Sequence, residues 1–215
     1  MDFRRAAAFC THWLVALALL PSAAPGQVIR FESGGLQFQT LTKGGVTVMF
    51  AALPMHVREY SILQVAVQNG SKASWTFKAE DFVFERSDGT RLPGAPARQV
   101  VGKLIEKGGR GDVIKLGQTY EQSLYGQARF KSTNGYEQRR QAAFAEVSNT
   151  KVKAAAVASA VAFPSVKLQP GQSTDGAVFY PTNGKGLGSG KLRLSAAGEI
   201  FEFEEIHPHS QTPNP

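Results

Sequence analysis

Apolar and polar residues alternate along two separate parts of the chain. Residues 28–92 and 166–206 contain short runs in which every second residue is apolar, a pattern typical of half-buried β-strands. The clearest runs are VTVMF (46–50), SILQVAVQ (61–68), DFVFER (81–86), GAVFY (176–180) and KLRLS (191–195). The pattern predicts a mainly β fold built from antiparallel sheets.

The polar stretch after residue 68 decides how two of these runs are connected. A two-residue turn at Asn69-Gly70 would set Val67 opposite Lys72 and mix buried with exposed positions on each face. We therefore expect the chain to cross here from one sheet to another, as in a β-sandwich. A slightly irregular hairpin is the alternative.

A three-residue loop at positions 87–89 is expected to form a hairpin. It pairs Phe84 with Leu92 and leaves Gly89 in the left-handed conformation that glycine adopts without strain.

Near the end of the chain, a turn at Ala197-Gly198 places apolar residues together on one face and opposite charges together on the other. The predicted pairs are Leu194 with Phe201, Leu192 with Phe203, Arg193 with Glu202 and Lys191 with Glu204.

The strand pattern is interrupted between residues 98 and 163. Asn134 and Glu137 have the spacing of a helix-capping box, and apolar residues then recur at helical intervals. The segment KVKAAAVASAVAF (151–163) either extends a helix or begins a strand, and we expect helix. The whole chain is thus predicted to be an antiparallel β-sandwich, residues 27–206, with a helical insert at 98–163.

The first 26 residues have the features of an export signal. Arg4 and Arg5 precede an apolar run at 13–20, and small residues lead to a cleavage position after Gly26. A membrane anchor is the alternative, but spanning a bilayer takes about 20 apolar residues, more than this run provides. We expect a periplasmic or secreted protein with a disordered tail at 207–215.

Cys10 is the only cysteine and lies within the predicted signal. The processed chain therefore contains no disulfide and no thiolate nucleophile or metal ligand. We expect no cofactor.

The positive charge is concentrated in the helical insert. Residues 98–153 contain 11 Lys or Arg against 5 Asp or Glu, whereas the rest of the chain from residue 27 contains 11 of each. The insert is therefore the candidate contact surface for an envelope protein, a cell-wall polymer or an anionic lipid surface. A solvated helix face without a partner is the alternative. The candidate residues are Arg129, Lys131, Arg139 and Arg140.

Two other functions are considered. A hydrolase would need paired carboxylates, for which Glu80 with Asp81 or Glu204 with Glu205 are the candidates. A periplasmic copper-binding protein would use thioether and imidazole ligands. Those available are Met49, Met55, His56, His207 and His209. Each of these groups has a simpler interpretation as a strand, strand-edge or tail residue, and we predict a protein that is not an enzyme.

Two short motifs are expected to be ordinary loops. Arg110-Gly111-Asp112 spells an integrin-binding tripeptide but lies in a glycine-rich connector. The stretch NGKGLGSGK (183–191) lacks the first glycine of a phosphate-binding loop and has Leu192 where Ser or Thr would bind magnesium.

The turn-rich motifs of the two β parts resemble bacterial exported immunoglobulin-like domains of uncharacterised function. The motifs are VAVQNGS (65–71), FVFERSDGT (82–90), LQPGQS (168–173) and GAVFYP (176–181). The resemblance covers about half of the chain and implies an immunoglobulin-like sandwich without catalytic residues. Together with the charge, it leads us to expect a non-enzymatic binding or assembly module of the bacterial cell envelope.

Overall fold

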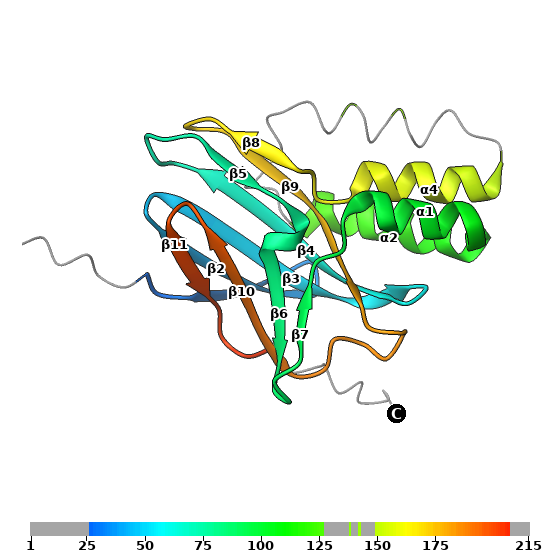
Figure 1. The fold of residues 1–215 in the computed structure, drawn as a ribbon, viewed down its shortest axis with the longest axis horizontal. Helices are drawn as coiled ribbons and strands as arrows, with labels where there is room; N and C mark the ends of the chain where they lie inside the picture. Colours follow the sequence, from blue (N-terminus) through cyan, green and yellow to red (C-terminus); the bar gives the residue numbers. More distant parts are fainter. Residues whose placement is uncertain (1–25, 127–137, 139–141, 143–148, 207–215) are drawn as a thin grey trace, which may run out of the picture.

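A five-stranded antiparallel sheet forms the middle of the molecule (Figure 1). In the computed structural model, residues 26–126, 138, 142 and 149–206 are described. The strands of this sheet, in the order in which they pair, are β1 (Ile29–Ser33), β2 (Leu36–Lys43), β3 (Val46–Val57), β4 (Tyr60–Asn69) and β9 (Ser173–Pro181). Both faces of the sheet carry buried side chains, and each face belongs to a different apolar core.

A four-stranded antiparallel sheet covers one face. It consists of β11 (Glu199–Glu202), β10 (Gly190–Ala196), β6 (Phe82–Arg86) and β7 (Arg91–Pro93), and a small pair of β5 (Trp75–Phe77) and β8 (Val166–Leu168) extends the cover. A single 3-10 turn, η1 (Ala79–Asp81), leads into β6. The expected mainly β fold with antiparallel sheets is thereby confirmed.

Aromatic side chains join the two sheets. Phe50 meets Phe203 edge to face with ring centroids 4.9 Å apart, and Phe84 meets Tyr180 at 6.2 Å. The Tyr180 hydroxyl donates to the carbonyl of Phe82 at 3.3 Å, and its complete burial raises the pKa of Tyr180 well above the usual value. The phenol therefore stays protonated and keeps this bond between the sheets.

Helices cover the opposite face of the five-stranded sheet. They are α1 (Ala97–Lys107), α2 (Arg110–Gly126) and α4 (Thr150–Val161). Val100, Leu104, Leu116 and Val157 on these helices are almost completely buried in the same core as Phe179 of the sheet. The helical insert is therefore a third layer with its own core, rather than a spare excursion attached to a finished sandwich.

The helix predicted after residue 150 is confirmed, and Asn149 begins it. The Asn149 side chain accepts hydrogen bonds from the amides of Lys151 at 3.0 Å and Val152 at 3.3 Å, the usual arrangement at a helix N-cap. The capping box predicted at Asn134 and Glu137 lies outside the described residues.

The predicted crossing at Asn69-Gly70 is also confirmed, because β4 and β5 belong to different sheets. Asn69 is buried at the crossing. Its amide donates to the carbonyls of Ala73 at 2.7 Å and Leu168 at 3.0 Å, and its side-chain oxygen accepts from the Ser71 amide at 3.1 Å. The asparagine thus satisfies backbone groups that the change of sheet leaves without strand partners.

The two predicted hairpins have the expected registers. Phe84 pairs with Leu92, Gly89 has a φ of 85°, and Leu194 pairs with Phe201. The prediction that Lys191 pairs with Glu204 is wrong.

The reason for that error is that β11 ends at Glu202. Lys191 bonds to Glu202, which lowers the pKa of that carboxyl. After Phe203, whose amide still bonds to Leu192, the register with β10 changes so that Ile206 bridges to Gly190, and Glu204 forms an ion pair with Arg30 in the other sheet.

Arg58 fastens the helical layer to the tip of the β3–β4 hairpin. Its Nε donates to Oδ2 of Asp112 at 2.8 Å, and its Nη2 donates to the carbonyl of Lys107 at the end of α1. Asp112 is only 8% exposed and also accepts from the amide of Gly109 at 2.8 Å. One guanidinium therefore satisfies both the buried carboxylate and an unpaired helix-end carbonyl.

Substituting Gly176→Ala is expected to destabilise the protein by about 1–3 kcal/mol, the usual cost of overpacking a buried site. A Cβ at this position would lie 2.5 Å from Cα of Phe163, because the segment after α4 runs directly against β9. Urea unfolding measures the change in the free energy of unfolding.

Gly102→Ala is the control. Among the described residues outside its own helix, nothing lies within 4 Å of a Cβ at position 102, so this substitution should stabilise α1 by about 0.5–1 kcal/mol. Equal behaviour of the two variants would contradict the close approach at Gly176.

Replacing Arg58 by Met should cost about 1–3 kcal/mol, because it leaves the Asp112 carboxylate buried without its cation. The double variant Arg58→Met, Asp112→Asn removes the uncompensated charge and should recover part of the loss. Thermal unfolding of both variants tests this coupling, and strictly additive effects of the two substitutions would argue against it.

Candidate functional site

The ends of three helices meet at one corner of the helical layer. The last turn of α1 and the first turns of α2 and α4 lie together there, and the helices run side by side (Figure 1). Four exposed cations occupy this corner, which we call the basic corner: Arg58, Lys107, Arg110 and Lys151. None of the four is among the four basic residues that the sequence predicted as partner contacts.

Carbonyl groups at the end of α1 accept hydrogen bonds from two of these cations. Besides the bond from Arg58 to the carbonyl of Lys107, Nζ of Lys151 donates to the carbonyl of Glu106 at 3.4 Å. The last carbonyls of α1 have no partners within the helix and carry the negative end of its dipole, so they stabilise nearby positive charge. The free carbonyls at the end of α1 therefore help to bring Arg58 and Lys151 to the basic corner.

Three of the four cations have no ion pair with any residue that the structure describes. Arg58 is paired with Asp112, but within the described ranges no carboxylate forms an ion pair with Lys107, Arg110 or Lys151. The basic corner thus presents net positive charge to solvent.

Exposed aliphatic side chains accompany the charge. Ile105 on α1, Ile114 on α2 and Val152 on α4 are 54%, 53% and 49% exposed. Each lies within four residues of a cation of the basic corner along its own helix. The helical layer therefore carries both positive charge and exposed apolar side chains.

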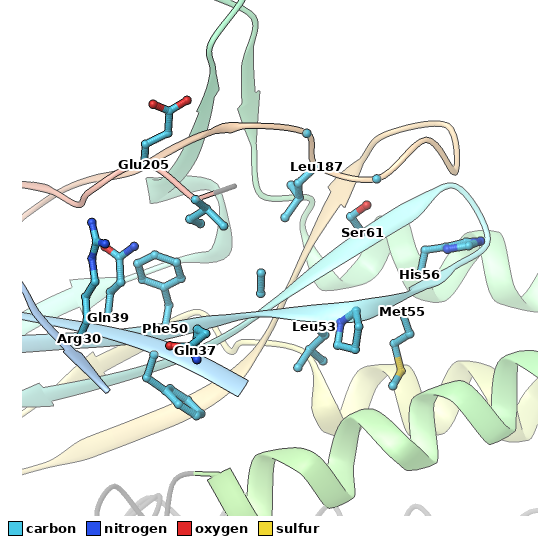
Figure 2. A pocket seen from close by; sticks show the side chains of 16 residues that line it. Arg30, Gln37, Gln39, Phe50, Leu53, Met55, His56, Ser61, Leu187 and Glu205 are labelled. Carbon is cyan, nitrogen blue, oxygen red and sulfur yellow. The ribbon is translucent and has the colours of Figure 1, made fainter. Parts of the chain in front are cut away.

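A second candidate site is a groove of about 540 Å³ at one end of the sandwich (Figure 2). It lies beyond the end of β2 at which that strand begins. There the last pair between β2 and β3 is Phe38 with Ala51, whereas β3 continues past Ala51 to Val57. Phe50 and Leu187 provide apolar walls from the sheet and from the β9–β10 loop. Polar groups line the rest, with Arg30, Gln39, His56, Ser61 and Glu205 among them.

Several polar groups of the groove form hydrogen bonds that hold the fold. Ser61 and Thr182 share a hydrogen bond of 2.8 Å, and Glu205 accepts from the Ser87 hydroxyl at 2.6 Å. The amide group of Gln39 bonds to the backbone of Glu204 in both directions. Among the described residues, the hydrogen bonds supply no serine–histidine pair in this groove.

The candidate carboxylate pairs do not converge. Glu204 is directed to Arg30 on β1, and its neighbour Glu205 is directed to Ser87 in the β6–β7 hairpin. In the other pair, Asp81 accepts from the amide of Lys78 at 2.8 Å at the start of η1, while Glu80 is exposed.

The candidate copper ligands are also separated. Met49 and Met55 belong to the core beneath the helices, where the Met55 sulfur accepts from the Thr119 hydroxyl at 3.5 Å, whereas His56 is exposed. The described part of the chain contains no group of three His, Cys, Asp or Glu residues that could hold a metal ion. His207 and His209 lie outside it.

The two short motifs have structural roles. The tripeptide at 110–112 forms the first turn of α2 rather than a loop, and its aspartate is buried against Arg58. Residues 183–189 connect β9 with β10, as expected for a loop between strands. The Arg86 guanidinium donates to the carbonyls of Gly186 at 3.0 Å and Leu187 at 2.8 Å. The loop therefore directs hydrogen-bond acceptors toward a cation, whereas binding a phosphate would require hydrogen-bond donors.

The four basic residues predicted from the sequence, Arg129, Lys131, Arg139 and Arg140, lie outside the described residues. The charge count did identify the insert that supplies Lys107, Arg110 and Lys151. It missed Arg58, which is remote in sequence and joins the corner only through its contacts with Asp112 and Lys107.

The chain matches no protein-family model, and comparisons with curated proteins and with solved structures find no match either.

Proposed function

We propose that the protein is an exported, non-enzymatic binding module of the bacterial cell envelope that attaches to an anionic phospholipid surface through its helical layer. The observation that carries the proposal is the basic corner, where three cations that form no ion pair among the described residues lie on helices that also expose Ile105, Ile114 and Val152. The sandwich, in this proposal of immunoglobulin-like type, holds those helices in place.

The apolar residues favour a lipid surface over a cell-wall polymer. Helices that bind at a membrane interface combine Lys or Arg with aliphatic side chains that enter the headgroup region. Each basic residue near an anionic lipid surface contributes about 1 kcal/mol of attraction, which fades within a Debye length. A soluble polyanion would use the charge but gain nothing from exposed isoleucine.

Attachment at a surface is the form of membrane contact proposed. None of the helices in the described ranges has both the length and the apolarity to cross a bilayer.

Neutralising the basic corner is expected to weaken vesicle binding about 100-fold. The variant Lys107→Gln, Arg110→Gln, Lys151→Gln removes three charges, or about 3 kcal/mol of attraction. Cosedimentation with vesicles of phosphatidylglycerol and phosphatidylcholine measures the partition coefficient. The control removes three exposed cations from other layers, Lys72→Gln, Lys167→Gln, Lys185→Gln, and should change binding far less. Equal losses would mean that only net charge matters, and an original chain that does not bind the anionic vesicles would refute the proposal.

The apolar contribution is tested separately by Ile105→Ser with Ile114→Ser. Both side chains are about half exposed, so folding should be little affected, while vesicle binding should fall roughly tenfold. Binding to dextran sulfate, a soluble polyanion, serves as the control and should not change. A variant that binds vesicles as well as the original chain would favour a polymer or protein partner instead.

A further inference from the structure

Strand edges offer unpaired backbone groups to other chains, and most edges of this protein are closed. Along β9, the amide of Ala95 donates to the carbonyl of Phe179 at 2.7 Å, and the amide of Phe163 donates to that of Ala177 at 2.8 Å. On β11, Nζ of Lys43 donates a hydrogen bond to the carbonyl of Ile200 at 2.7 Å. Blocking an edge in this way prevents unwanted strand pairing.

The remaining edges are interrupted or short. The part of β3 that extends beyond β2 contains Pro54 and a bulge between Ala52 and His56, both of which prevent regular pairing. The edge strand β7 has three residues and ends with Pro93.

The outer edge of β1 lacks these devices. Its five residues, IRFES, pair with β2 in unbroken register and include no proline. Among the described residues, no strand pairs with its other side. Ile29 and Phe31 are 58% and 38% exposed, so the edge is also apolar.

We propose that β1 pairs with β1 of a second copy of this chain, in antiparallel orientation about a two-fold axis at Phe31. Phe31 then lies opposite Phe31 of the partner, Ile29 opposite Ser33, and Arg30 opposite Glu32. The five-stranded sheets of the two copies become one continuous sheet of ten strands.

Charge selects this register from its neighbours. If the two-fold axis lay at residue 30, Arg30 would lie opposite Arg30 of the partner, and if it lay at residue 32, Glu32 would lie opposite Glu32. Like charges in directly opposed positions repel. Only the register centred on Phe31 forms two Arg–Glu pairs, because the symmetry repeats each pair.

The existing contacts of these residues are compatible with the pairing. Phe31 stacks on Phe38 of β2 with ring centroids 5.3 Å apart, which fixes the ring at the edge of the sheet. The side chain of Arg30 remains 58% exposed although it pairs with Glu204, and a guanidinium has five N–H donors, enough for a second carboxylate. Glu32 accepts one bond from the Gln37 amide at 2.8 Å and is exposed.

The interface is small. Five residue pairs bury less than the roughly 1,200 Å² of a stable standard interface, so the dimer should form in a concentration-dependent manner. Sedimentation equilibrium over a range of protein concentrations is the suitable measurement.

A charge swap tests the register. Arg30→Glu and Glu32→Arg should each weaken dimerisation about tenfold or more, because each places like charges opposite one another twice in the interface. The double variant Arg30→Glu, Glu32→Arg restores opposite charges and should regain most of the affinity. Since Arg30→Glu also disturbs the ion pair with Glu204, Glu32→Arg is the cleaner single variant, and thermal unfolding verifies that both fold. A double variant no better than the singles would overturn the register.

Cysteine crosslinking gives an independent readout. In the proposed pairing residue 31 alone lies opposite itself, and directly opposed Cα atoms in an antiparallel pair are about 4.5–5.5 Å apart, within the range for a disulfide. In a chain carrying Cys10→Ser, Phe31→Cys should form a disulfide-linked dimer under mild oxidation, whereas Arg30→Cys and Glu32→Cys should not. Preferential crosslinking at position 30 or 32 would show a shifted register.

An original chain that stays monomeric at all concentrations would refute the dimer, as would an edge occupied only by a different protein. Vesicle binding depends on other residues, so the two proposals can fail separately.

Discussion

Burial of the five-stranded sheet on both faces is the constraint from which the rest of this structure follows. Every residue from Tyr60 to Val67 on β4 is buried, and so is every residue from Ser173 to Tyr180 on β9. An antiparallel sheet with one wet face would alternate buried with exposed positions. This sheet instead needs two covers, and the second sheet and the helical layer provide them without a disulfide in the described part of the chain.

The cover explains where the charge lies. The helices must direct Val100, Leu104 and Val157 inward to bury the sheet, so the Lys and Arg residues that the structure describes on α1, α2 and α4 are left for the outer face and the helix ends. At the end of α1, free carbonyls and the tip of the β3–β4 hairpin gather cations from distant parts of the sequence. A positively charged surface thus arises from the same packing that completes the core.

The order of strands explains the open edge in the same way. Segments before α1 and after α4 close one side of the sheet, where Ala95 and Phe163 cover β9. At the other side, β1 has β2 as its one neighbour among the described residues. The groove beyond β2 has a related origin, since β3 and β4 extend further than β1 and β2 do. Gln39, Ser61 and Glu205 in this groove hold the second sheet and the loops in place, which leaves the helical layer as the stronger candidate for contact.

Local patterns in the sequence by themselves determined the mainly β class, the helix after residue 150, the crossing at Asn69 and two hairpin registers, because side-chain alternation and turn geometry act over a few residues. These local patterns could not show that Gln64 and Ala66 would be buried under helices, since Gln and Ala occur both on solvent-exposed and on buried sheet faces. They also mispaired Lys191, because the register changes between Phe203 and Ile206, and Glu204 forms an ion pair with Arg30, a residue remote in sequence. The basic corner and the closure of β9 were decided only by tertiary structure, because they depend on contacts between segments remote in sequence.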